Sequence, residues 1–439
     1  MKKHALSRRE FLRMSAVAAV GAALASCARG TEFASEQETV EEAPVPEAIE
    51  LTYWVNAGDR RFGIYQETLD WFEEENPNLS VKMEALTGDG VAQQQKTLVA
   101  IASGSAPDIV HVDNPFVNQV VGLGVSLPLD ELDGYQEIEE ALWPGTIDTH
   151  IFDGHTWALP VRGNSYQYYY DKDLAAAAGL DPDSPPVYLS DLTEWAAAMT
   201  ERDASGMVVK YGYDRTGPTD ARWACHAWYT MLWGYGGDLL TEDGHAAWNS
   251  DAGEKALQWW MDLVEAESSP AVSIDNSMAL GHAASMCTGE WEIQTLKNEL
   301  GINLGVSKFP YPEGGVHKIS LGGRCMMMYK MNTHPGEGWM LMKHIMSKRA
   351  QMHVTKALEG LTPLVDVLDD PWWDENPEYK LTHQDMANSV ATPHTPYYME
   401  HIDILMKMYE KALGGVMGAR QALDEAADEF NQIVDTGDK

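Results

Sequence analysis

The chain has 439 residues and a formal net charge of −36, because 67 acidic residues outnumber 31 lysines and arginines. A surface this acidic repels nucleic acids and anionic membranes, which excludes both as partners and makes large polyanions poor substrates. The length exceeds one ordinary hydrophobic core and predicts two domains.

The first 27 residues predict export followed by attachment to lipid. The run SRREFLR at residues 7–13 matches the twin-arginine export pattern, and the apolar stretch that follows is too short to span a bilayer. Residues 24–27, LASC, resemble the bacterial lipobox, whose cysteine becomes the new N-terminus. An ordinary N-terminal helix with two arginines is the weaker alternative. Residues 1–26 are therefore predicted to be a twin-arginine lipoprotein signal peptide, and Cys27 the lipidated residue.

Removal of residues 1–26 takes away five basic residues and one acid, which leaves a mature charge of −40. Residues 27–48 are rich in Glu, Ala, Pro and Ser and have no apolar periodicity, so they predict a disordered tether. No later stretch reaches the roughly 18 apolar residues that a membrane helix needs. The mature protein is expected outside the cytoplasmic membrane, in the periplasm or at the cell surface, and held there by lipid alone.

Strands and helices alternate at the start of the globular part. The run LTYWV at 51–55 predicts a strand, and Tyr65, Leu69 and Phe72 share one face of a helix that ends before Pro77. A second strand at 79–85, a helix at 94–102 and a third strand at 109–112 follow. This alternation predicts a parallel, twisted α/β sheet.

The second half of the chain is more helical. Helices are expected at 190–200, 251–265 and 339–347, and the two tryptophans at 259 and 260 are expected to pack inside. The last helix carries its small and apolar residues at helical spacing, so they lie on one face. This pattern predicts that the helix docks on a domain. That face comprises Ala419, Ala422, Leu423, Ala426, Ala427, Phe430, Ile433 and Val434. Beyond Cys27 the three cysteines, Cys225, Cys287 and Cys325, are widely spaced and odd in number, so buried, unreactive thiols are expected.

Seven short segments occur in an order that is typical of one protein family. They are FEEENPN at 72–78, AIASGSAPDIV at 100–110, DGHTWALP at 153–160, YDKDL at 170–174, GGD at 236–238, AL at 256–257 and GEW at 289–291. Together with the strand around Trp54, they resemble the family 1 extracellular solute-binding proteins, the maltose-binding-protein-like receptors of ABC importers. The resemblance covers roughly residues 50–435.

The resemblance implies a two-lobed α/β fold of the periplasmic-binding-protein type 2 class, with hinge crossovers near residues 161, 321 and 370. Lobe one would comprise residues 49–161 plus 322–370, and lobe two residues 162–321 plus 371–439. A ligand would lie in the cleft between the lobes, which close on it by a hinge motion. The implied function is a monomeric receptor that passes a mono- or oligosaccharide to an ABC permease. It is not an enzyme and needs no cofactor or metal.

Candidate ligand contacts combine aromatic rings with polar groups at strand ends. Trp and Tyr, at 15 and 18 residues, outnumber the 8 Phe, and such rings can lie on the apolar face of a sugar. Trp291, next to Glu290, holds the place where the family puts a sugar-stacking tryptophan. The other candidates are Asn56, Asp59 and Arg60 in the loop after the first strand, Asp113 and Asn114 after the third, Arg162, Asn164 and Tyr166 past the first hinge, Gly323 and Arg324 at the second crossover, and Trp223 and Tyr398 from lobe two.

Two other functions remain open at this point. Abundant Asp, Glu and Trp also suit a secreted glycoside hydrolase with two carboxylates, although no pair stands out. The same fold could instead bind a polyamine, a phosphodiester or a metal, but the fourteen histidines include no close pair at ligand spacing. Arg60, Arg162 and Arg324 suit an acidic sugar or phosphate ester as well as neutral hydroxyls. Arg162 and Asn164 stand where the maltose receptor has an acid, which argues against maltose itself.

Overall fold

The computed structural model describes residues 48–56, 59–88, 90–215, 224–358, 360–390 and 395–437. The predicted signal peptide, Cys27 and all of the tether except Ala48 lie outside these residues. Residues 48–439 form one compact unit. None of the helices in the described part of the chain is both long and apolar enough to cross a membrane.

The larger sheet holds the first three strands of the globular part and the chain's longest strand. Its members are β1 (Ile49–Val55), β2 (Leu79–Ala85), β3 (Ile109–Asp113), β6 (Leu159–Ser165), β12 (Ile319–Met328) and β13 (Ser389–Val390). The order is β13-β12-β3-β1-β2, and β6 also pairs with β12. β1 is parallel to β2 and β3, as predicted, but β12 runs antiparallel to both β3 and β6. The predicted parallel pairing is therefore confirmed for the first three strands, and β12 makes the complete sheet mixed.

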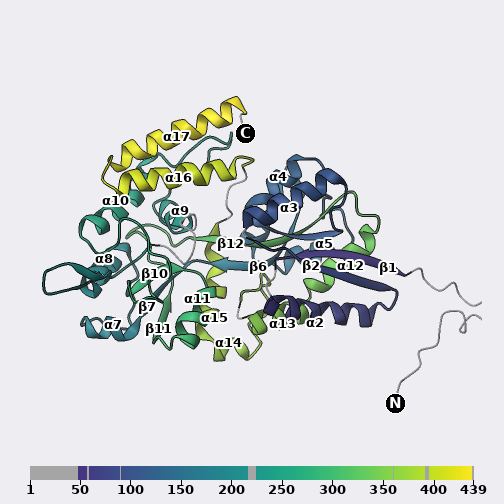
Figure 1. The fold of residues 1–439 in the computed structure, drawn as a ribbon, viewed down its shortest axis with the longest axis horizontal. Coiled ribbons are helices and arrows are strands. Elements are labelled where there is room, and N and C mark those ends of the chain that lie inside the picture. Colours follow the sequence, from purple (N-terminus) through teal and green to yellow (C-terminus); the bar gives the residue numbers. More distant parts are fainter. Residues whose placement is uncertain are drawn as a thin grey trace, which may run out of the picture. The chain divides into compact units, whose positions relative to one another are not determined.

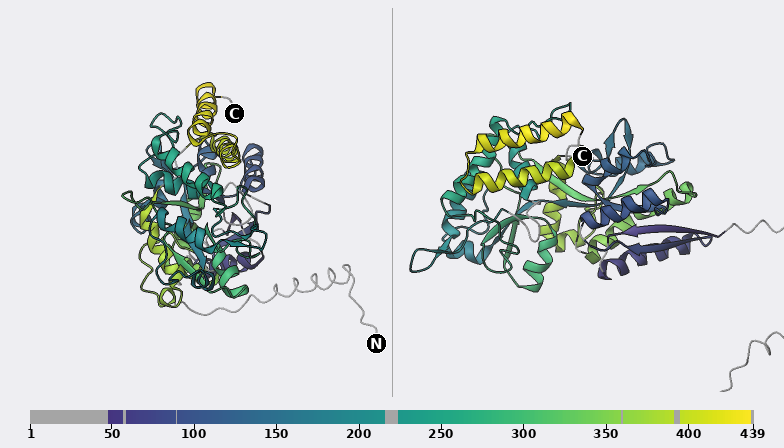
Figure 2. Two further views of the ribbon diagram at one scale, coloured as in Figure 1. Left: turned by 90° about the vertical axis from the view of Figure 1, so that its left-hand side faces the viewer. Right: turned by 45° about the horizontal axis from the view of Figure 1, so that its top comes forward.

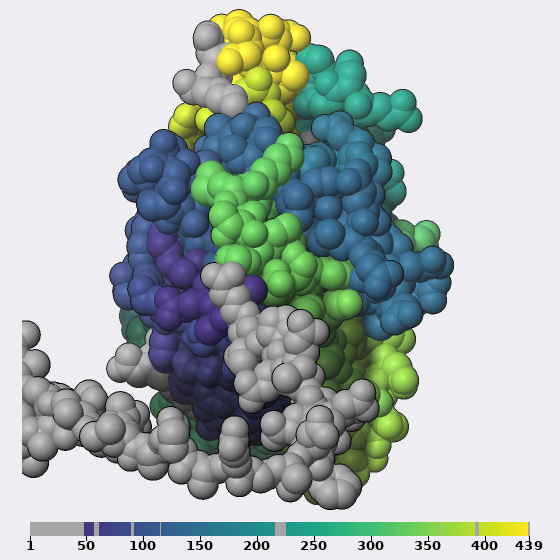
Figure 3. Space-filling view, turned by 90° about the vertical axis from the view of Figure 1, so that its right-hand side faces the viewer, coloured from purple at the N-terminus to yellow at the C-terminus, as the bar shows by residue number. Residues whose placement is uncertain are grey.

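Helices α2 (Asp59–Glu75), α3 (Gly90–Ser103), α4 (Val117–Gly122), α12 (Pro335–Ile345) and α13 (Lys348–Leu358) surround this sheet (Figure 1). Leu69 and Phe72 of α2 are buried with Leu51 and Tyr53 of β1, which confirms the apolar face predicted for that helix. Figure 3 shows green segments from the later part of the chain between blue and purple segments from its first part. Distant parts of the sequence thus build one lobe.

The smaller sheet is antiparallel and has the order β10-β7-β11. Its strands are β7 (Gln167–Asp171), β10 (Ser285–Thr288) and β11 (Leu304–Ser307), and its neighbouring helices are α7 (Lys172–Ala177), α8 (Leu189–Met199), α9 (Ala224–Gly234), α10 (Asp251–Glu265), α16 (Tyr398–Leu413) and α17 (Ala419–Thr436). Trp259 and Trp260 are buried in this core, as predicted. The expected helix at 339–347 begins earlier, because Pro335 supplies its first turn.

The C-terminal helix packs along its neighbour. Figure 2 shows α16 and α17 side by side, and the buried residues of α17 are Ala419, Ala422, Leu423, Ala426, Ala427 and Phe430. Ile433 and Val434 are partly buried against the same core, which confirms the predicted docking face. Cys225, Cys287 and Cys325 are buried and unbridged, as expected.

The chain passes from the larger sheet to the smaller one directly after β6. β6 pairs with β12 of the larger sheet, whereas β7, which follows it, pairs with β10 and β11 of the smaller sheet. Leu159 and Val161 of β6 are buried in one apolar cluster and Tyr166 and Tyr168 in another, but Tyr169 of β7 belongs to the first, so the two clusters meet here. The candidate site lies where β6 and β12 pair, and this place is called the crossing.

The remaining elements connect these parts. They are η1 (Asn114–Phe116), α5 (Tyr135–Glu140), α6 (Pro144–Asp148), β4 (Ile151–Phe152), β5 (His155–Thr156), β8 (Glu201–Arg202), β9 (Val208–Lys210), α11 (Trp291–Ile293), η3 (Gln294–Glu299), α14 (Trp372–Glu375), α15 (Pro377–Asp385) and η4 (Met386–Asn388).

Candidate ligand-binding site

Two arginines are neighbours where β12 lies between β3 and β6. The backbone of Arg324 is in register with Asp113 on one side and with Arg162 on the other. Arg324 Nη2 lies 3.0 Å from Asp113 Oδ1, and Arg162 Nε donates a hydrogen bond of 3.1 Å to Asn164 Oδ1. Four of the predicted contact residues thus lie together at the crossing strands.

Gly323 allows the two crossing strands to approach this closely. Its φ of +145° falls in the range that favours glycine, and a Cβ atom would lie 2.3 Å from the carbonyl oxygen of Arg162. The pairing register shifts directly after it, between Arg324 and Cys325. A bulge of this kind re-aims side chains along a strand, and here it follows the arginine pair.

The ends of β1 and α3 add amide groups to the same place. Asn56 Nδ2 donates to Gln93 Oε1, which also accepts a bond of 3.4 Å from Arg324 Nη1. The amide of Gln93 is fixed in turn by its bond of 2.7 Å to the carbonyl of Gly88. Gln93 is not among the predicted residues, because one of three consecutive glutamines carries no signal that separates it from its neighbours.

The segment after β1 differs from the expectation. Asp59 and Arg60 were predicted in a loop, but they are the first two residues of α2, because the helix begins almost directly after the strand. The positions of their side chains lie outside the described part of the structure. The next residue, Arg61, is near enough to the site for its charges to act on it: the charge of Arg162, followed by burial, lowers the pKa of Arg61, and Arg324 adds to this effect. Sequence reasoning missed Arg61.

Asn114 presents a buried acceptor without a partner. The residue opens η1 directly after β3, only 6% of its surface is exposed, and its Oδ1 has no hydrogen-bond partner. Its Nδ2 would lie 3.4 Å from a Cβ on Gly323, so the amide borders the crossing strands. An unpaired buried acceptor is costly, and a ligand hydroxyl would satisfy it.

Glu290 and Trp291 approach the crossing from the smaller sheet. Glu290 is only 1% exposed, and its Oε2 accepts a bond of 3.4 Å from the backbone amide of Ser165. Burial raises the pKa of Glu290 to about 7, although the charge of Arg162 acts in the opposite direction. The ring of Trp291 covers Gly289, where a Cβ would lie 1.9 Å from the indole. Only glycine fits beneath this half-buried ring.

Tyr166 supports that ring from the segment between β6 and β7. Its ring meets Trp291 edge to face and stacks on His226 with centroids 4.7 Å apart. His226 Nδ1 is hydrogen-bonded to Ser320 Oγ at 2.7 Å, and burial lowers the pKa of the histidine to about 4, so the imidazole is neutral at pH 7. Tyr166 is itself buried, and in this structure its ring packs between Trp291 and His226.

The other two lobe-two predictions have different outcomes. Tyr398 is the first residue of α16, and its ring stacks on His401 with centroids 6.4 Å apart. Trp223 lies outside the described residues. Among the described residues, no three His, Cys, Asp or Glu side chains gather closely enough to hold a metal ion.

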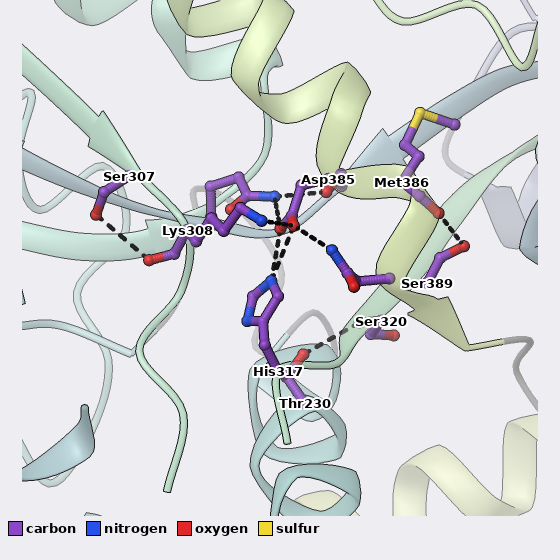
Figure 4. A network of polar contacts seen from close by, with 11 residues as sticks. Thr230, Ser307, Lys308, His317, Ser320, Asp385, Met386 and Ser389 are labelled. Atoms are coloured by element: carbon purple, nitrogen blue, oxygen red, sulfur yellow. Dashed lines mark hydrogen bonds and ion pairs between the residues drawn. The ribbon is translucent and has the colours of Figure 1, made fainter. Parts of the chain in front are cut away.

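A polar network fixes the smaller-sheet side of the crossing (Figure 4). Asp385, at the end of α15, accepts hydrogen bonds from His317 Nε2 at 2.9 Å and from Gln167 Nε2 at 2.9 Å, and Lys308 Nζ lies 3.2 Å away. Burial alone would raise the pKa of Asp385, but the bond from His317 and the other contacts hold it below its usual range. The network ties β7, α15 and the segment that leads into β12 to one carboxylate.

Comparisons with known proteins give the chain a family. A family model described as bacterial extracellular solute-binding protein matches residues 67–381. The arabinooligosaccharide-binding protein of Halalkalibacterium halodurans is 24% identical over 348 residues, which cover 76% of this chain and 75% of that protein.

Solved structures share the fold. The cyclic alpha-maltosyl-1,6-maltose binding protein of Arthrobacter globiformis superposes with a TM-score of 0.80 at 24% identity, covering 88% of this chain and 99% of its own. The sugar-binding protein MalE of Xanthomonas citri gives a TM-score of 0.78 at 18% identity, with coverage of 88% and 98%. These superpositions confirm the predicted two-lobed fold of the periplasmic-binding-protein class.

Proposed function

The chain belongs to the bacterial extracellular solute-binding protein family, and we propose that it captures a mono- or oligosaccharide for an ABC importer. The observation that carries the proposal is Trp291, a half-buried indole held over Gly289 and against Tyr166; its neighbour Glu290 lies within electrostatic reach of Arg61 and Arg162. An aromatic face next to fixed polar groups suits a sugar ring, whose faces are apolar and whose edge is made of hydroxyls.

The proposed lobes follow the division expected from the sequence, residues 49–161 plus 322–370 and residues 162–321 plus 371–439. The change of sheet between β6, which pairs with β12, and β7, which pairs with β10 and β11, supports a crossover there. The ligand would then contact Asn56, Asp113, Asn114, Arg162 and Arg324 from around the larger sheet, and Glu290 and Trp291 from the other lobe. Closure of the lobes would remove water from these contacts and strengthen them.

The first 48 residues support the proposed location and anchoring. The run SRREFLR and the LASC sequence ending at Cys27 suit export by the twin-arginine route followed by lipidation. Residues 28–48 would then set the reach of a monomeric receptor that stays close to its permease.

Binding without turnover is proposed in preference to glycoside hydrolysis. Hydrolysis needs two carboxyl groups that face each other across the scissile bond. Asp113 is engaged by Arg324 at 3.0 Å, and Glu290 is almost fully buried against the amide of Ser165. Neither is placed as an available acid or nucleophile.

A thermal-shift screen of the mature protein against mono- and oligosaccharides tests this proposal. We expect at least one sugar to raise the midpoint of unfolding, because a ligand that binds only the folded state stabilises it. The same sugar should be recovered intact after prolonged incubation. A library without any shift, or the release of reducing ends, would overturn the proposal.

A further inference from the structure

Three arginines converge at the crossing strands from three separate elements. Arg61 lies in the first turn of α2, Arg162 in β6 and Arg324 in β12. Arg162 and Arg324 are direct cross-strand neighbours, and each of them lowers the pKa of Arg61 through its positive charge. These three residues form the arginine cluster.

Acidic side chains do not balance this cluster. Asp113 pairs with Arg324 at 3.0 Å, which neutralises one of the three charges. Glu290 is within electrostatic reach of both Arg61 and Arg162, but its raised pKa of about 7 leaves it only partly ionised at neutral pH. Among the residues that the structure describes, neither Arg61 nor Arg162 has a carboxylate within ion-pair distance. The site therefore carries excess positive charge.

This local charge runs against the rest of the molecule. The chain has 67 acidic residues, and three arginines elsewhere are paired with them: Arg202 with Glu267 at 2.6 Å, Arg349 with Glu75 at 3.2 Å and Arg420 with Glu254 at 2.6 Å. The buried Arg215 instead donates to backbone carbonyls. Like charges held together at a partly desolvated site repel each other and lower the stability of the folded state. Arginines with a purely structural role would be more stable if they were paired with carboxylates of the chain. The unbalanced positive charge therefore points to a negative charge that a ligand supplies.

The geometry of guanidinium groups identifies that charge. A guanidinium offers a planar fork of donors that matches the two oxygens of a carboxylate or the oxygens of a phosphate, and such charge-assisted bonds are about twice as strong as neutral ones. Hydroxyls of a neutral sugar would leave the repulsion among the arginines in place. We infer that the bound sugar carries an oxyanion, either a uronic-acid carboxylate or a phosphate ester, which the arginine cluster holds. This inference rests on the proposed binding of a carbohydrate at this site.

Matched pairs of sugars test the inference by titration calorimetry of the mature protein. The carboxylate series compares oligogalacturonates and glucuronate-substituted xylo-oligosaccharides with their neutral counterparts, and the phosphate series compares sugar phosphates with the parent sugars. We expect one acidic member to bind at least tenfold tighter than its neutral counterpart. The series in which this occurs identifies the oxyanion.

Two variants separate the cluster from general electrostatics. Arg162→Gln should reduce the preference for the acidic member over its neutral counterpart at least tenfold. Arg349→Gln, which removes an equal charge from the outer surface of α13, should keep the full preference. Circular dichroism and thermal melts verify that both variants fold. If Arg162→Gln does not fold, the Arg61→Gln variant tests the cluster in its place.

The possible failures are distinguishable. If neutral sugars bind as tightly as the acidic ones, or if Arg162→Gln and Arg61→Gln both keep the preference, the inference is overturned and the proposed function stands. If no acidic member binds but a neutral sugar does, the result is the same. If neither kind of sugar binds, the inference and the proposed function both fail.

Discussion

The indole of Trp291 meets the ring of Tyr166 edge to face, with centroids 5.6 Å apart and planes at 81°. This contact joins the start of α11 to the segment that links β6 and β7, which is the point where the chain passes from the larger sheet to the smaller one. Because Gly289 lies directly beneath the indole, the ring is held from two sides. A rigid aromatic surface at this crossing loses little conformational entropy when a sugar stacks on it.

Replacing Trp291 by alanine should weaken sugar binding about 5- to 150-fold and leave the fold intact. The ring is only half-buried, so its removal takes away a stacking surface worth about 1–3 kcal/mol and little core volume. Titration calorimetry measures the loss of binding, and circular dichroism monitors the fold. The control is Trp71→Ala, which removes a half-buried indole of α2 that lies beneath the guanidinium of Arg349. This variant should bind the sugar as tightly as the wild type. Equal binding by the Trp291→Ala variant would remove this residue from the site.

Glu290→Gln should change how stability depends on pH. Burial raises the pKa of the folded-state carboxyl from 4.5 to about 7, so the folded protein binds the proton more tightly than the unfolded chain does. The stabilising effect of that proton is complete below about pH 4.5 and is lost as the pH rises through 7. The variant should therefore match the wild type near pH 5 and exceed its free energy of unfolding by about 2–3 kcal/mol at pH 8.

Urea unfolding at pH 5, 6, 7 and 8 measures this difference. Glu50→Gln, at an exposed position of β1, should follow the wild-type profile at every pH and serves as the control. A constant offset between Glu290→Gln and the wild type would show that the carboxyl is not the titrating group.

Gly323→Ala should destabilise the protein and weaken binding together. The new Cβ would lie 2.3 Å from the carbonyl oxygen of Arg162, and φ is +145°, so the backbone must shift at the arginine pair. We expect a loss of about 2–4 kcal/mol in the free energy of unfolding. Gly314→Ala also has a positive φ but open space around the new atom, and should cost about 1 kcal/mol without affecting binding. Equal losses in the two variants would contradict the close approach of β6 and β12.

Asp385→Asn should destabilise the crossing at neutral pH. The carboxylate is buried and receives contacts from His317, Gln167 and Lys308, and removal of one partner from such a network costs about 2–4 kcal/mol. Because the folded-state pKa of Asp385 is lowered, its stabilising effect is present above its usual value near 4 and is lost as the pH falls through the folded-state value.

The measurement is denaturant unfolding at pH 7 and at acidic pH, with Asp369→Asn as the control. Asp369 is exposed and pairs with Lys348 at the surface, so its replacement should leave stability unchanged. If Asp385→Asn is as stable as that control at pH 7, the network does not hold the crossing.

Cys27→Ala should release the protein from the membrane without altering its ligand binding. The variant lacks the thiol that the lipobox pattern marks for lipidation, but residues 48–439 are unchanged. Partitioning into detergent and titration with sugar measure the two properties separately. Replacing Arg8 and Arg9 by lysine should instead keep the precursor inside the cell. A Cys27→Ala protein that stays membrane-bound would contradict the proposed anchor.

The sequence was informative wherever spacing alone decides structure. The strands at the start of the chain, α8, α10 and the docking face of α17 follow from apolar periodicity, and the structure has each of them. Apolar periodicity does not indicate whether a strand pairs parallel or antiparallel with its neighbours. The antiparallel pairing of β12 could therefore not be predicted from the order of elements. That pairing is what brings Arg324 between Asp113 and Arg162.

The choice between neighbouring arginines illustrates the same limit. A loop after β1 was expected to present Arg60, but α2 begins at Asp59, and successive helical residues point about 100° apart. A shift of one residue in the start of a helix turns a side chain by that angle, and such a shift is within the precision of any boundary predicted from sequence. Arg61, which the sequence did not single out, is the residue whose pKa the charges of Arg162 and Arg324 lower.

Hydrogen–deuterium exchange, with and without the sugar that gives the largest thermal shift, tests most directly whether the sugar is captured between the lobes. We predict that amides near Asn56, Asp113 and Arg162 and those of residues 289–293 become protected together, because both lobes close on one ligand. Protection confined to a single lobe, or equal exchange in the two states, would contradict capture between the lobes.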